Sequence, residues 1–329
     1  MSFRISPAWW PVLTVASPAL VPLLLMRNRR FQKNRARASE ENHDRISQAK
    51  PLDLPEVEYI DLTVLVEWKT EEGFLGDAGV SYVFATDLGS MLFDVGFGPT
   101  RPAFGHNAAK LGFAMDQVEA LAISHLHSDH MGGIPAQRAR QLTIPDDMMP
   151  PAPIPCFLPD HAQAPGFTPQ LVEEPQLLRA GMATTGPLAR SLFLFGFTEE
   201  QALLVRVKGK GLAVVTGCGH PTIEVILEMI GRLSSEPLYA IAGGLHFPVS
   251  GGRGNRVGLQ FQTFMGTGKP PWQRITDQDL SRTIEAINRA APKMVYLSAH
   301  DTCDHALARM SQELQAETQV LKAGATYRF

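Results

Sequence analysis

The feature that most constrains this chain is a run of ten residues from Ser124 to Gly133, which reads Ser-His-Leu-His-Ser-Asp-His-Met-Gly-Gly. Three histidines and one aspartate within six positions form a dense set of nitrogen and oxygen donors, which suits zinc or related divalent first-row metals. A short apolar strand is predicted at Leu121–Ser124, so the loop after it can turn alternate side chains toward different ions. A surface or core histidine cluster is the alternative, but four donors at this spacing before a Gly-Gly pair favour a metal site.

The composition is that of a globular protein, with 44% hydrophobic and 19% charged residues among 329. This length allows one large two-layered domain or two ordinary ones. The net charge of −3 gives no reason to expect nucleic-acid binding. Cys156, Cys218 and Cys303 cannot all pair with one another and match no disulfide framework, which indicates a reducing compartment.

The N-terminal segment differs in kind from the rest of the chain. No charged residue occurs from Ile5 to Met26, and six basic residues follow between Arg27 and Arg37. About 20 apolar residues suffice to span a bilayer, and basic residues after the segment favour a cytoplasmic location for the downstream domain. Four prolines weaken the helix, so an interfacial or re-entrant anchor stays open, as does an apolar tail that packs on the domain or a partner. We predict a membrane anchor at residues 1–30, a polar linker at 31–56 and a folded domain at 57–329.

Strands and helices are predicted in both halves of this domain. Strands are expected at Tyr59–Val66, Val80–Ala85, Met91–Val95, Leu121–Ser124, Pro155–Leu158, Ser191–Phe195, Ala202–Val207, Leu212–Thr216, Leu238–Ala242, Lys293–Ser298, Gln319–Leu321 and Thr326–Phe329. Helices are expected at Asn107–Gly112, Ile223–Leu233, Asp277–Ala290 and Asp304–Gln315, with Thr276 as an N-cap. Pro145–Pro175 is expected to be a long loop or lid, and Ser250–Pro271 a flexible insertion near the site. Two packed sheets with helices outside account for this order, which is an α/β (α+β) fold.

Several short motifs around the histidine run fall in a recurring order. Ser124–His130 matches the HxHxDH signature of hydrolases with the metallo-β-lactamase fold, and Phe93-Asp94-Val95-Gly96 matches the turn that precedes it. One subgroup, the dihydropterin ribofuranosyl-aminobenzene phosphate synthases, is resembled at Gly79-Val80-Ser81, Asn107–Gly112, Thr216-Gly217-Cys218-Gly219-His220 and Gly243-Gly244-Leu245-His246. The resemblance covers roughly residues 57–329 and implies an αββα sandwich of two mixed sheets, with the catalytic site in that domain.

The same resemblance implies a binuclear metal site. His125 and His127 resemble the pair that holds the first ion, and Asp129 and His130 resemble the pair for the second. Cys218 stands where the superfamily has a bridging aspartate, so it either ligates as a thiolate or packs as a small buried side chain. The further ligands implied are His220, His246 and His300, of which His246 alternatively donates a hydrogen bond to the substrate. Asp94 is expected to accept the free N–H of a ligating histidine, and Asp301 has no assigned role.

These expectations describe a metal-dependent hydrolase that uses a metal-bound hydroxide at a binuclear site. Its cofactors would be two divalent ions, zinc first and manganese or iron as alternatives, and Asp129 would be the catalytic residue that orients the nucleophile. The expected substrate is a small anionic molecule of phosphoester type, with a lactone, thioester or amide left open. Arg253, Arg256 and Lys269 either meet that anion or belong to a solvated loop. The alternative functions are a redox di-iron member of the fold and a non-catalytic metal-binding protein at the membrane.

Overall fold

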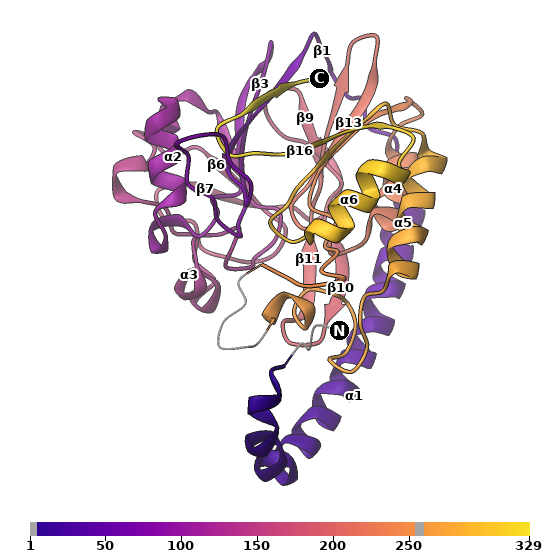
Figure 1. Ribbon diagram of the computed structural model, residues 1–329. Coiled ribbons are helices and arrows are strands. Elements are labelled where there is room, and N and C mark those ends of the chain that lie inside the picture. Colours follow the sequence, from indigo (N-terminus) through magenta and orange to yellow (C-terminus); the bar gives the residue numbers. More distant parts are fainter. Residues whose placement is uncertain (1–4, 254–259) are drawn as a thin grey trace.

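Two β-sheets pack face to face at the centre of the molecule (Figure 1). The computed structural model describes residues 5–253 and 260–329. The first sheet runs in the order β17 (Thr326–Arg328), β2 (Ile60–Val66), β3 (Ser81–Thr86), β4 (Gly89–Phe93), β5 (Ala120–Ala122), β6 (Pro155–Leu158) and β7 (Thr168–Leu171). Its strands are antiparallel from β17 to β4 and parallel from β4 to β7, so the sheet is mixed.

The second sheet is also mixed. It runs in the order β16 (Glu317–Val320), β15 (Met294–Leu297), β14 (Leu238–Gly243), β13 (Gly211–Thr216), β12 (Leu203–Val207), β9 (Met182–Thr184) and β8 (Gln176–Leu177), with β1 (Glu56–Val57) beside β12. Strands β13 to β16 are parallel to one another, whereas β12 is antiparallel to both β13 and β9. A separate hairpin joins β10 (Leu188–Leu192) to β11 (Gly196–Glu200).

Helices cover the outer faces of both sheets (Figure 1). The first sheet carries α2 (Ala103–Leu111) and α3 (Ile134–Ala139), and the second carries α4 (Ile223–Leu233), α5 (Asp277–Ala290) and α6 (Asp304–Glu313). Helix α5 begins at the predicted N-cap, where Thr276 and Asp279 form a reciprocal capping box. Short 3₁₀ turns occur at Pro7–Trp9, Gly98–Thr100, Met115–Gln117, Asp146–Met148 and Phe261–Thr263.

The core has three apolar layers, because successive side chains of a strand point to opposite faces of its sheet. In β4, Phe93 lies between the two sheets, while Leu92 packs outward toward α2. In β13, Val215 faces the inter-sheet layer and Val214 faces the layer under α4, α5 and α6. This helix–sheet–sheet–helix order is the predicted αββα sandwich.

Most of the predicted elements of the domain are present, with bounds that differ by a few residues. The strand predicted at Ser191–Phe195 was placed too late, since β10 ends at Leu192 and Phe193–Phe195 lies at the turn of the hairpin. The proline-rich segment holds β7 in addition to the predicted β6. Of the predicted insertion at Ser250–Pro271, residues 254–259 lie outside the described part of the chain.

The segment predicted as a polar linker is helical up to Gln48 and belongs to α1 (Trp10–Gln48), which corrects that expectation. Phe31, Ala38, Asn42 and Ile46 are buried on one face of it. Asn42 Nδ2 donates to the main-chain oxygen of Ala189 at 2.9 Å, and its Oδ1 accepts from the N–H of Ala189 at 2.7 Å. The charged residues that suggested a linker occupy the remaining faces. The few buried residues recur at helical spacing, but the polar residues between them make that pattern hard to recognise in the sequence.

The N-terminal half of α1 is apolar and uncovered. An 18-residue window there has a mean hydropathy of 1.6 with none of it buried, so by length and composition the helix is long and apolar enough to cross a membrane. Pro18 and Pro22 lie inside the helix. A proline within a helix removes a backbone hydrogen bond and kinks the axis, and in Figure 1 the indigo part of α1 turns back sharply below the domain.

Candidate metal centre

The loops that carry the predicted metal ligands all follow the carboxyl ends of parallel strands. The histidine run follows β5, Cys218 and His220 follow β13, His246 follows β14, and His300 follows β15. Carboxyl ends of neighbouring parallel strands meet at one edge of a sheet, and the two sheets bring their edges together here. All eight predicted metal ligands therefore lie in one cluster, although they are spread over 176 positions of sequence from His125 to His300.

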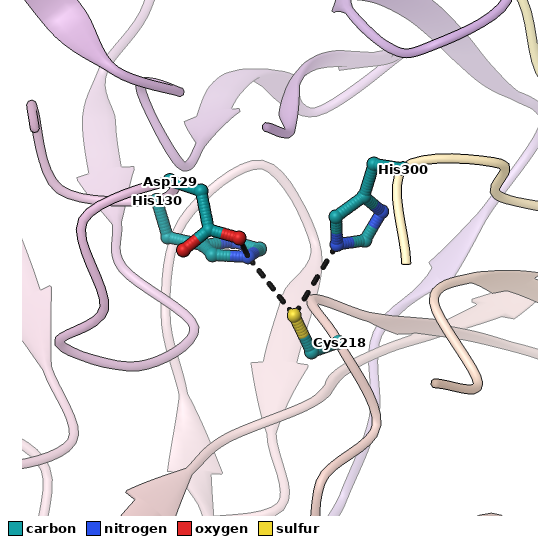
Figure 2. A group of neighbouring side chains, drawn as sticks. All are labelled: Asp129, His130, Cys218 and His300. Atoms are coloured by element: carbon teal, nitrogen blue, oxygen red, sulfur yellow. Dashed lines mark hydrogen bonds and ion pairs between the residues drawn. The ribbon is translucent and has the colours of Figure 1, made fainter. Parts of the chain in front are cut away.

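The donor atoms fall into overlapping groups, within each of which they lie no more than 4.8 Å apart. One group is His125, His127 and His220. A second is Asp129, His130, Cys218 and His300, in which the Cys218 Sγ lies 3.1 Å from His130 Nε2 and 3.2 Å from His300 Nε2 (Figure 2). A third is Cys218, His220 and His246, so Cys218 and His220 each belong to two groups.

Asp94 binds the Nδ1 side of the His130 ring, opposite the nitrogen that faces the cluster. This fully buried carboxylate accepts from His130 Nδ1 at 2.6 Å, and it also accepts from the main-chain N–H and the hydroxyl of Ser124 at 2.7 and 2.6 Å. With the proton on Nδ1, the lone pair of His130 Nε2 points toward Cys218 and Asp129. This is the contact expected for Asp94, and it orients the ring and sets its tautomer.

A second buried carboxylate, Glu67, plays the same part for His300 and was missed in the sequence. His300 Nδ1 lies 2.5 Å from Ser298 Oγ, and the Ser298 hydroxyl donates to Glu67. His300 Nε2 is thereby left to face Cys218, which mirrors the arrangement of His130. The only sign of this role in the local sequence is that Glu67 directly follows the apolar strand β2. Its hydrogen-bond partner Ser298 is 231 positions away.

Two further acidic groups shape the turn after β13 and the loop after β14. Glu200 accepts from the main-chain N–H groups of Gly219 and His220 at 2.7 and 2.8 Å, and burial raises its pKa to about 7. Asp301 accepts from the main-chain N–H of His246 at 3.2 Å and lies 3.6 Å from its Nδ1. Neither residue was assigned a role from the sequence.

The histidines divide into two electrostatic classes. Burial, with a further contribution from neighbouring histidines, lowers the pKa of His125 and His220, and burial lowers that of His127 to about 3. These three imidazoles are therefore neutral at ordinary pH, with lone pairs free to bind a cation.

The other histidines lie close to acidic groups. Burial opposes the charged form of His130, but Cys218 and Asp94 outweigh it and raise the pKa of that ring. His300 behaves in the same way under Asp301 and Cys218, and the pKa of His246 rises to about 10, since its contact with Asp301 outweighs burial. The buried acidic groups thus stabilise positive charge near His130, His246 and His300. A protonated imidazole would supply that charge, and so would a bound metal cation.

The donor chemistry fits a metal ion. Among the described residues, His125 Nε2 and His127 Nε2 are buried without any hydrogen-bond partner, and His246 Nδ1 has only the ion pair with Asp301 at 3.6 Å. An unpaired buried polar atom costs about 1–3 kcal/mol, so the two nitrogens of His125 and His127, which belong to one donor group, indicate a shared ligand such as a metal ion. Neutral imidazoles, a thiol and one carboxylate are the ligand types that zinc prefers.

The basic residues predicted to meet an anion have different surroundings. Arg253 pairs with Asp304 at 3.1 Å and donates to the main-chain oxygens of Ala299 and Thr302, so it holds a loop together. Arg256 lies outside the described residues. Lys269 lines a cavity beside His220 and His246.

Comparison with known proteins agrees with this architecture. Residues 75–140 match the model of the metallo-β-lactamase superfamily, and no curated protein matches the chain. The solved structure of Tm1679, described as a metal-dependent hydrolase of the β-lactamase superfamily, is similar with a TM-score of 0.57 and 22% identity over 82% of this chain and 98% of its own. YhfI from Bacillus subtilis, a metallo-β-lactamase-fold protein, matches with a TM-score of 0.47 and 14% identity over 82% and 99%. The chain therefore has the metallo-β-lactamase fold, and its residues 75–140 carry the sequence pattern of that superfamily.

Proposed function

We propose that this protein is a metal-dependent hydrolase with two divalent ions, zinc first, acting on a small anionic substrate of phosphoester type. The observation that carries the proposal is that two donor groups are linked by a third, which shares His220 with one and Cys218 with the other, and that His125 Nε2 and His127 Nε2 in the first group are buried without a hydrogen-bond partner. Its relation to the dihydropterin subgroup stays a prediction.

The assignment of ligands follows the first two of the three donor groups. His125, His127 and His220 would hold the first ion, and Asp129, His130, Cys218 and His300 the second. His246 adds a donor atom beside Cys218 and His220 and can complete either set. When bound, the ions would lower the pKa of a coordinated water and polarise the substrate oxygen.

Asp129 is the proposed catalytic residue. Its side chain is 22% exposed, whereas the carboxylates of Asp94 and Asp301 are fully buried behind histidines. Its pKa is lowered, since burial is outweighed by His130 and the other nearby histidines, so it is ionised and acts as a hydrogen-bond acceptor. Asp129 can therefore orient an attacking water by accepting its proton in a hydrogen bond.

Two other functions are less well supported. A redox di-iron protein expects a carboxylate-rich ligand set, and the donor groups in the described part of the chain contain one carboxylate, Asp129. A non-catalytic scaffold would not need an intact donor set with support behind both His130 and His300. The apolar half of α1 supports a membrane-associated protein, and the basic residues after it favour a cytoplasmic domain.

The test is metal content per chain, measured by elemental mass spectrometry on the full-length protein and on Asp129→Ala and His130→Ala. We expect close to two ions in the natural sequence and close to one in either variant, with loss of hydrolysis across chromogenic phosphoesters, lactones and thioesters. His106→Ala, which removes an exposed histidine outside the cluster, is the matched control. One ion or none after metal-replete purification, or undiminished turnover in either variant, would contradict the proposal.

A further inference from the structure

A cavity of about 180 Å³ lies against the metal centre, with His220 and His246 in its wall. Arg190, Lys269 and Arg282 line it together with Asp279 and Glu224. Three basic groups against two acidic ones leave an excess of one positive charge. The cavity therefore favours an anion next to the centre.

Arg190 is the basic residue of this set without an ion pair. Lys269 Nζ lies 2.6 Å from Asp279 Oδ2, and Arg282 Nη2 lies 3.2 Å from Asp279 Oδ1, so both are paired. Arg190 lies on β10 and is partly buried, and its side chain forms no ion pair or hydrogen bond with another described residue. Burial lowers its pKa, and Arg35 lowers it further against the opposite effect of Glu224. A guanidinium that is partly withdrawn from water and forms no ion pair is stabilised by a ligand that supplies negative charge.

The N-terminus of α4 points into the same cavity. Thr222, Ile223 and Glu224 line it, and Thr222 occupies the N-cap position without accepting a hydrogen bond with its side chain. The first N–H groups of a helix have no partner within the helix, and they carry about half a positive charge. Such a terminus binds phosphate and other anions.

We propose that this cavity binds a phosphate group of the substrate other than the group that is cleaved, with Arg190 and the α4 terminus as its ligands. The planar fork of an arginine suits two phosphate oxygens, and the main-chain N–H groups suit a third. The natural substrate then carries two anionic groups, one at the metal centre and one at Arg190. The inference rests on the proposed function of the neighbouring site.

The experiment is calorimetric titration of inorganic phosphate into the full chain purified with its metal. The natural sequence is compared with Arg190→Met, Arg190→Lys and Arg138→Met, and metal content is measured on the same samples. Arg138 is an arginine on α3, so its variant removes the same charge away from the cavity. We expect phosphate to bind about tenfold more weakly or worse to Arg190→Met, since a charge-assisted bidentate contact is lost, with Arg190→Lys between the two. Arg138→Met should bind phosphate like the natural sequence.

The outcomes separate the two proposals. If phosphate binds Arg190→Met as tightly as the natural sequence, it is held at the metal centre alone and the inference is wrong, whatever the metal content. If every sample holds fewer than two ions but binding still depends on Arg190, the cavity proposal stands and the binuclear hydrolase does not. Arg190→Lys keeps the test decisive if the thermal transition of Arg190→Met shows that it is unfolded, since full-strength phosphate binding by Arg190→Lys would contradict the bidentate contact.

Discussion

Replacing Glu67 by glutamine tests whether a side chain outside the donor set controls metal binding. The carboxylate accepts from Tyr82 Oη at 3.0 Å, from the hydroxyl of Ser298, and from the main-chain N–H groups of Trp68 and Ala299 at 2.8 and 3.1 Å. All of these partners are donors. A glutamine offers one oxygen and places an NH₂ group against the remaining donors, so about two hydrogen bonds to a charged acceptor are lost.

Each such bond contributes roughly 1.5 kcal/mol, so Glu67→Gln should lower the free energy of unfolding by about 3 kcal/mol. With the NH₂ group at the Oε1 position, Ser298 loses the acceptor that orients its hydroxyl, and the Nδ1 side of His300 is held less firmly. Loss of such support behind a ligating histidine typically weakens metal binding by about 10- to 100-fold. The assays are urea denaturation of the metal-loaded protein and competition for zinc against a chromogenic chelator.

Glu71→Gln is the matched control. Glu71 pairs with Lys322 at 3.0 Å with both side chains nearly half exposed, and a surface pair of this kind contributes at most about 1 kcal/mol. Zinc affinity in Glu71→Gln should equal that of the natural sequence. If Glu67→Gln proved as stable as Glu71→Gln and bound zinc equally well, the reasoning from buried acceptors would be wrong.

Three other perturbations probe α1 and the unusual thiol. Asn42→Ala should destabilise the docking of α1 by about 2 kcal/mol or more, since it leaves the N–H and C=O of Ala189 without partners, and faster hydrogen exchange in α1 would report it. A chain of residues 27–329 should be soluble and should melt well above a chain of residues 39–329, because the latter loses the buried Phe31, a side chain whose removal typically costs about 3–5 kcal/mol. Cys218→Asp should lower the ratio of zinc to manganese bound from an equimolar mixture, since a carboxylate is a harder ligand than a thiolate.

These tests have their own controls and contrary outcomes. Glu40→Ala changes an exposed position of α1 and should leave hydrogen exchange unchanged. Equal melting temperatures for the two truncated chains would mean that residues 27–38 do not support the domain. An unchanged metal ratio in Cys218→Asp would mean that the thiol only packs beside the ions.

The sequence predicts well those features that depend on neighbours in the chain. The donors of the histidine run lie on one loop. Helix α5 begins after Thr276, a residue type that the sequence already identifies as a suitable N-cap. The apolar stretches of β4 and β13 identify core strands because both faces of each strand are buried. The order of motifs then places the remaining histidines at strand ends, which is where the structure has them.

Features that depend on distant pairing were not predictable in this way. Glu67 is one acidic residue after an apolar strand, and nothing nearby shows that Ser298 and Tyr82 will surround it. The orienting role of Glu200 depends on main-chain groups 19 and 20 positions further on. Residues 31–48 were misjudged because the segment is mostly polar and its few buried residues form no obvious apolar stripe, whereas packing on β10 and β11 stabilises the helix.

The continuity of α1 has a mechanical consequence. A flexible tether would let the domain tumble freely above a bilayer, whereas one helix contains both the exposed apolar half and the part fixed to Ala189 by a pair of hydrogen bonds. For a chain held at a membrane by residues 1–30, that helix would act as a bracket and restrict rotation of the domain. The candidate metal centre would then keep a constant orientation relative to the lipid surface.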